Sequence, residues 1–150
     1  QLIKHNRHNL RAHLAYDVSS QFSIRSRIEF SFYQNQSFNK GFVIYQDLIF
    51  KPKKIPLKIQ TRLAFFDTDN YDTRIYAFEN DVLYAFSVLP YYGQGLRYYF
   101  NVSYKINRNF SLWLRFSQTY FTDRSVISSG LNEIDAATRS EIKVQIRANF

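Results

Sequence analysis

The sequence contains, at residues 140–150, the stretch that decides its fold: Ser140-Glu141-Ile142-Lys143-Val144-Gln145-Ile146-Arg147-Ala148-Asn149-Phe150. Apolar residues alternate with polar ones from Ile142 to Phe150. Successive side chains of an extended strand point to opposite faces, so one face of this segment is apolar and the other is polar and charged. The segment is also long enough to cross a bilayer at a tilt. It therefore predicts a long strand with two unlike faces.

The same alternation recurs along most of the chain. Polar or turn-forming segments separate alternating runs at 9–18, 22–33, 42–51, 57–66, 96–106 and 110–120. The 15 Phe and 12 Tyr favour strands over helices, and 150 residues fit one domain. We therefore predict an all-β fold, an antiparallel meander of about nine strands over residues 9–150, preceded by a polar lead-in loop at residues 1–8.

Charged residues sort onto one face of these runs. In the strands whose faces can be assigned, no Asp, Glu, Lys or Arg occupies the apolar face. One Arg or Lys at the lipid midplane costs about 2–4 kcal/mol, so this exclusion is expected of strands in a bilayer. The chain lacks the run of roughly eighteen apolar residues that a transmembrane helix needs. The pattern predicts an antiparallel transmembrane β-barrel, porin-like, in contact with the lipid of a bacterial outer membrane.

Aromatic residues gather near the strand ends, which suits the interfacial girdles of such barrels. Ile146, Ala148 and Phe150 resemble the terminal signal that the barrel-insertion machinery reads, so this machinery is an expected partner. The alternative is a soluble, lipocalin-like ligand-binding barrel with the apolar face inward. A small closed barrel needs small, tapering side chains inside, whereas Phe, Tyr, Leu and Ile repeat on this face. The membrane barrel is the preferred interpretation.

Basic residues outnumber acidic ones on the polar face. If this face lines a lumen, its field is positive and favours anions. The candidate lumen-facing basic residues are Arg25, Arg27, Lys58, Arg62, Arg97, Arg115, Lys143 and Arg147. Two other arrangements stay open: a packed interior with ion pairs, and a face covered by a plug.

The region Arg74–Pro90 is the hardest to assign. It fits one long strand, or two short ones folded at Asn80-Asp81. Ser19–Gln21 and Asn107–Asn109 are near-twin turns, each followed by Phe-Ser and an alternating strand, and both resemble the short periplasmic turns of barrels. Two turns on the same side need an even number of strands between them, so we predict two strands in this region. The polar residues 122–139 predict a long extracellular loop.

The run Phe65–Phe86 is similar to a segment of a Bacteroidetes outer-membrane family whose members carry an N-terminal helix-hairpin-helix region resembling the DNA-uptake protein ComEA. The likeness continues at Tyr91–Gly95, Leu112–Phe116 and Ser129–Ile134. It falls at the C-terminal end of the family. The resemblance implies that the chain is the final part of a larger barrel, with a missing N-terminal part or other envelope proteins as partners. The helix-hairpin-helix region is not in this sequence, so no nucleic acid partner is expected for this segment.

Sequence signatures of catalysis are absent: there is no Gly-rich phosphate loop, Gly-x-Ser-x-Gly or His-Glu-x-x-His. Asp67, Asp69 and Asp72 offer oxygen ligands, but the glycine and distal glutamate of a calcium loop are missing. We therefore expect no cofactor, no metal and no enzymatic activity, although an outer-membrane enzyme using its extracellular loops stays an alternative. The predicted role is structural or transport: a pore or a scaffold within an envelope complex.

Overall fold

The structure is a computed structural model, and it describes residues 6–35 and 37–149. These residues form nine β-strands, so the all-β, antiparallel prediction is confirmed. The strands are β1 (Asn6–Asp17), β2 (Phe22–Gln34), β3 (Phe38–Phe50), β4 (Leu57–Thr68), β5 (Ile75–Glu79), β6 (Ser87–Tyr91), β7 (Gln94–Lys105), β8 (Phe110–Phe121) and β9 (Thr138–Ala148). Two short 3-10 helices, η1 (Tyr71–Thr73) and η2 (Gly130–Asn132), lie in connections.

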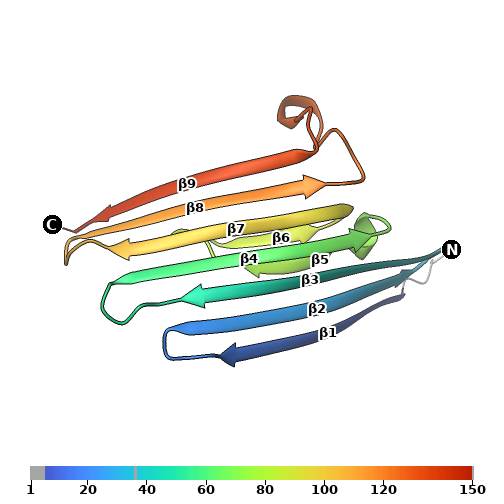
Figure 1. Ribbon diagram of the computed structural model, residues 1–150. Coiled ribbons are helices and arrows are strands. Elements are labelled where there is room, and N and C mark those ends of the chain that lie inside the picture. The colour runs from blue at the N-terminus through green and yellow to red at the C-terminus, as the bar shows by residue number, and fades with distance from the viewer. Residues whose placement is uncertain (1–5, 36, 150) are drawn as a thin grey trace.

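Seven of the strands form one curved antiparallel sheet in the order β1-β2-β3-β4-β7-β8-β9 (Figure 1). Each is 11 to 13 residues long. Within the described residues, β1 pairs only with β2 and β9 only with β8. The sheet therefore has two open edges, and these residues do not close it into a barrel.

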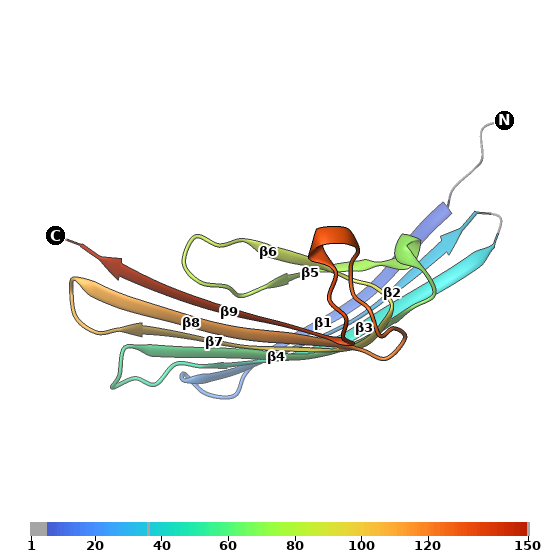
Figure 2. The same cartoon turned by 90° about the horizontal axis from the view of Figure 1, so that it is seen from above.

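Strands β5 and β6 form a separate hairpin that lies over one face of the sheet, on the inner side of its curve (Figure 2). Two strands in this region were predicted correctly, but their expected place between β4 and β7 is wrong. Strand β4 pairs directly with β7 along its length, from Leu57↔Tyr104 to Asp67↔Gln94, which leaves no room for them. The turn of the hairpin also spans residues 80–86 and not Asn80-Asp81 alone.

The near-twin turns share one hydrogen-bonding scheme. The Ser19 hydroxyl accepts hydrogen bonds from the backbone N–H groups two and three residues later, and the Asn107 side-chain oxygen does the same. Both turns lie at the same end of the sheet, beside the connection of residues 51–56 (Figure 1). We call this the turn end. The opposite, loop end carries η1 and the long connection of residues 122–137.

The first strand begins earlier than predicted. Asn6 already pairs with Gln34 across the β1–β2 ladder, so residues 6–8 belong to β1 and not to a lead-in loop. Residues 1–5 of the expected loop lie outside the described part of the chain. No helix among the described residues is long and apolar enough to cross a membrane.

The two faces of the sheet differ in what covers them. On the apolar face no described residue covers the side chains, and Leu63 and Phe65 of β4 are 45% and 51% exposed. On the polar face, Arg62 of the same strand is only 3% exposed, because the hairpin lies over it. A small apolar core also lies under the hairpin near the loop end, where the ring of Phe66 meets those of Tyr91 and Phe121 edge-on at 5.4 and 5.9 Å. The buried part of the protein is therefore the polar face.

Candidate functional site

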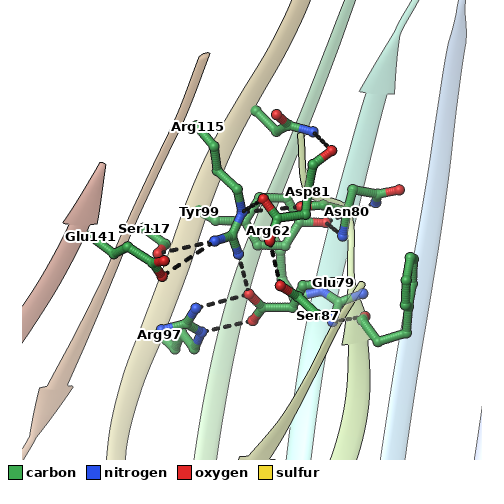
Figure 3. Close-up of polar contacts among 12 residues, drawn as sticks. Arg62, Glu79, Asn80, Asp81, Ser87, Arg97, Tyr99, Arg115, Ser117 and Glu141 are labelled. Atoms are coloured by element: carbon green, nitrogen blue, oxygen red, sulfur yellow. Dashed lines mark hydrogen bonds and ion pairs between the residues drawn. The ribbon is translucent and has the colours of Figure 1, made fainter. Parts of the chain in front are cut away.

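Glu79, the last residue of β5, lies at the centre of the contact between the hairpin and the sheet (Figure 3). Its two carboxylate oxygens accept four hydrogen bonds. Arg97 of β7 donates from Nε and Nη2 at 2.7 and 2.9 Å, Arg115 of β8 donates from Nη2 at 2.5 Å, and the hydroxyl of Tyr91 donates at 2.8 Å. Glu79 is completely buried, so one hairpin carboxylate joins two buried sheet cations away from water.

The ion pairs determine the charge state of Glu79. Burial alone would raise the pKa of its carboxyl, because it disfavours the charged form. The hydrogen bonds from Arg97 and Tyr91 and the positive charges of Arg97 and Arg115 outweigh burial and lower the pKa below its ordinary value. Glu79 is therefore ionised at neutral pH.

Asp81, in the turn of the hairpin, makes a second set of contacts. Its Oδ2 accepts from Lys143 Nζ of β9 at 2.7 Å and from the hydroxyl of Ser87, and its Oδ1 accepts from the backbone N–H of Val82 at 2.7 Å. Arg115 Nε lies 3.8 Å from Oδ1. Burial raises the pKa of Asp81, but the hydrogen bonds from Lys143 and Ser87 lower it further, so its net direction is below the ordinary value.

Neutral groups complete the contact. Asn80 Nδ2 donates to the hydroxyl of Tyr99 at 2.9 Å, and its backbone oxygen accepts from Arg115 Nε at 3.1 Å (Figure 3). Asn101 Nδ2 donates to the backbone oxygen of Asp81 at 3.2 Å. The turn of the hairpin is therefore held by its main chain as well as by its two carboxylates.

A further buried pair lies on the sheet itself. Arg62 of β4 donates from Nε and Nη2 to the two oxygens of Asp47 on β3, at 2.6 and 2.8 Å. Its remaining Nη1 donates to the backbone oxygen of Phe78 in the hairpin at 2.8 Å, and its guanidinium carbon lies 3.7 Å from the ring centroid of Tyr45. Planar, two-pronged pairs of this kind fix orientation as well as charge. Arg62 thereby links two sheet strands to the hairpin.

The basic residues predicted from the sequence do not act as one group. The structure places them in three environments along the polar face: Arg62, Arg97 and Arg115 are buried under the hairpin, Arg27, Lys58 and Lys143 are partly buried, and Arg25 and Arg147 are exposed. Arg27 pairs with Glu29 and also reaches the backbone oxygen of Tyr76 in the hairpin. Of the three arrangements that the sequence left open, the structure contains the packed face with ion pairs, covered by a hairpin.

The other predicted site residues lie apart from this network. Asp69 accepts a hydrogen bond from the backbone N–H of Lys40 at 2.8 Å, whereas Asp67 is the residue before the last one of β4 and Asp72 lies in η1. In the described ranges, no three His, Cys, Asp or Glu side chains are grouped so as to hold a metal ion. Ile146 and Ala148 are exposed at the end of β9, and Phe150 lies outside the described residues.

Sequence reasoning missed Glu79 and Asp81 as functional residues. A signal for Glu79 was present: it shares the parity of Ile75 and Ala77, which are both 1% exposed, so its side chain points with theirs toward the sheet. An acidic residue at such a position needs a cationic partner, and the polar face carries an excess of cations.

The fold and this network define the class of protein: an all-β antiparallel sheet whose polar face is covered by its own acidic hairpin. Comparison with protein-family models, with curated proteins and with solved structures finds no match to the chain.

Proposed function

We propose that this chain forms part of the wall of a β-barrel in a bacterial outer membrane, with its apolar face toward lipid and its hairpin in the lumen. In this proposal its partners are outer-membrane lipid and the barrel-insertion machinery. Its role is structural or in transport, within the cell envelope.

The observation that carries the proposal is the inverted polarity of the sheet. Buried groups include Glu29, Asp47, Arg62, Glu79 and Arg115, whereas large apolar side chains of β1, β3, β4, β7, β8 and β9 are exposed on the other face. A soluble protein hides its apolar face and leaves charges in water. An uncovered apolar face of this extent favours a lipid environment.

The strand lengths agree with this. Strands of 11 to 13 residues rise about 3.3 Å per residue, and tilted by about 45° they span roughly 25–30 Å, close to the hydrocarbon thickness of a bilayer. Backbone groups in lipid must all be paired, so the proposal requires further strands at the open edges of β1 and β9. These strands come from the same polypeptide or from another chain.

Arginine scanning of the two faces tests the proposal. Leu63→Arg places a charge at the middle of the apolar face, and Asn9→Arg places the same charge on the polar face of β1, where the hairpin does not cover it. In phospholipid vesicles we expect Leu63→Arg to lower the free energy of unfolding by about 2–4 kcal/mol and Asn9→Arg to leave it nearly unchanged. A protein that stays folded in water without detergent, and becomes more soluble with Leu63→Arg, would show the proposal to be wrong.

Between an open pore and a scaffold, the hairpin favours a barrel whose lumen is blocked. Four of the predicted lumen-facing cations, Arg62, Arg97, Arg115 and Lys143, are bonded to Asp47, Glu79 or Asp81. We expect little conductance from the intact protein in planar bilayers, and anion-selective conductance when residues 70–91 are replaced by an Asn-Gly turn. Large conductance by the intact protein would instead favour an open pore, and its loss on neutralising Arg25, Arg27 and Arg62 would assign it to the basic face.

The proposal retains the resemblance to the Bacteroidetes helix-hairpin-helix family. The segment that carries most of it, Phe65–Phe86, covers the end of β4, η1 and most of the hairpin. The likeness therefore concerns the hairpin more than the sheet, and in this proposal the hairpin is the feature that the family shares.

A further inference from the structure

The turn end of the polar face holds a groove that the hairpin does not cover. It has a volume of about 620 Å³, within the usual range of ligand sites, and lies between the connection of residues 51–56 and the adjoining ends of β7 and β8. Its lining contains five lysines and the only tryptophan of the chain: Lys51, Lys53, Lys54, Lys58, Lys105 and Trp113. Among residues 6–35 and 37–149, no acidic side chain lines it.

These lysines differ from the cations under the hairpin, because none of the five has an ion pair or a side-chain hydrogen bond to another described residue. The Lys58 ammonium is repelled by the positive charges of Lys51 in the same groove and of the nearby Arg25. The fold concentrates like charges here without neutralising them, whereas at the centre of the sheet it supplies Glu79 and Asp81. Such a group of charges is stabilised by a multivalent anion from solution.

The orientation of the side chains identifies the source of that anion. Lys58 has the parity of Arg62 on β4, Lys105 that of Arg97 on β7, and Trp113 that of Arg115 on β8, so all three belong to the polar face. Leu57 and Tyr104, which have the parity of the apolar face, contribute only uncharged side chains to the lining. The two sheet lysines and the indole therefore lie on the same side of the sheet as the hairpin, which favours a solute over a lipid headgroup at the rim of the apolar face.

We propose that this groove binds a soluble polyvalent phosphate anion. Ammonium groups recognise phosphate as compact point charges, and several together are needed to hold a ligand of charge two or more. The indole N–H of Trp113 adds a neutral donor and its ring a flat apolar surface beside the charges. That an anion binds here follows from the unpaired lysines of the groove alone, whereas the choice of a solute over a lipid headgroup rests on the proposed function.

Trp113 makes the test direct, because tryptophan fluorescence of the folded full chain in neutral detergent, excited at the red edge where the 12 tyrosines do not absorb, reports from this groove alone. We expect inorganic tripolyphosphate to change the fluorescence saturably, with weaker binding as salt is raised. Neutralising Lys58 and Lys105 together, as Lys58→Gln/Lys105→Gln, is expected to weaken binding at least tenfold. The matched control Lys40→Gln/Arg139→Gln removes two exposed charges at the loop end and is expected to leave the affinity within twofold.

Three results would overturn the inference: no saturable change with tripolyphosphate, unchanged affinity in the groove variant, or equal weakening in the control. A second titration distinguishes the source of the phosphate. If micelles containing phosphatidylglycerol change Trp113 fluorescence while tripolyphosphate does not, the groove binds lipid headgroups and the soluble ligand is wrong. Circular dichroism of each variant verifies folding, which is expected to survive because removing repelling charges costs little.

Discussion

Replacing Glu79 with glutamine tests whether the hairpin is held to the sheet by charge. Glutamine keeps the size of the side chain and can still accept two hydrogen bonds, but it cannot neutralise Arg97 and Arg115. These arginines are 9% and 1% exposed, so water does not replace the lost carboxylate while the hairpin stays in place.

The magnitude follows from the contacts. Removing one partner of a buried ion pair costs about 3–5 kcal/mol, because it leaves an uncompensated buried charge. Here the hairpin can relieve that cost by leaving the sheet, which exposes both arginines to solvent. Every 1.4 kcal/mol is about a factor of ten, so the population of the undocked hairpin is expected to rise by roughly 10²–10⁴.

The absence of cysteine from the chain provides the assay. Ala77 of β5 lies on the side of the hairpin that faces the sheet and is 1% exposed. Ala77→Cys therefore gives a thiol that a bulky maleimide reaches only when the hairpin undocks. We expect Glu79→Gln in this background to accelerate labelling at least a hundredfold. Glu133→Gln, which removes an equal charge from an exposed loop position, is the control and is expected to label at the parent rate. Equal rates for Glu79→Gln and its parent would refute the charge-based account of docking.

Three further outcomes follow. Because Glu79 and Asp81 have lowered pKa values, their contribution to docking is fully present above about pH 4 and is lost as the pH falls through the lowered values. Hydrogen exchange of the hairpin amides, corrected for its intrinsic pH dependence, is therefore expected to stay slow at pH 5. Fast exchange at that pH would contradict this. In a double-mutant cycle of Asp47→Asn and Arg62→Gln, urea unfolding in detergent is expected to give a coupling energy of about 1–3 kcal/mol, and simple additivity would mean that the pair contributes nothing. Gly95→Ala is expected to lower the unfolding free energy by roughly 1–3 kcal/mol, since the new methyl group meets a backbone carbonyl of β8, and wild-type stability would show that the two strands separate easily there.

The strands and faces of the sheet were predictable because short stretches of sequence determine them. Alternation with period two fixes which residues share a face, and one Ser or Asn side chain closes each of the twin turns, so strands and faces follow from short windows of sequence. The sorting of charges along β4 likewise placed Lys58 and Arg62 on one face and Leu63 on the other. Strand ends were less certain because pairing sets them: Asn6 joins β1 only through its partner Gln34.

The hairpin was not predictable in position because its partners are distant in sequence. Arg115 lies 36 residues from Glu79, and Lys143 lies 62 residues from Asp81. A strand of five residues has the same alternation whether it joins the sheet or covers it. Either arrangement places the twin turns at the same end, since two strands outside the sheet leave an even number of sheet strands between them. Only the pairing of the hairpin carboxylates with distant cations distinguishes a hairpin within the sheet from one that covers it, and predicting that pairing requires knowing which strands are neighbours.

The hairpin behaves as an insertion between two strands that are otherwise direct neighbours. At its base, Thr68 N–H donates to the backbone oxygen of Gly93 at 2.9 Å, and Gly93 N–H donates to the Thr68 hydroxyl at 2.7 Å, so the β4–β7 ladder is closed before the chain departs. Gly93 has a φ of 77°, a conformation in which glycine is unstrained, and this turns the returning chain into β7. The register of the sheet therefore does not depend on the hairpin, and the hairpin depends on the sheet through its charges. Sheet and hairpin can change separately: substitutions at Glu79 and Asp81 alter what covers the polar face, while the strand pairing that builds the sheet stays the same.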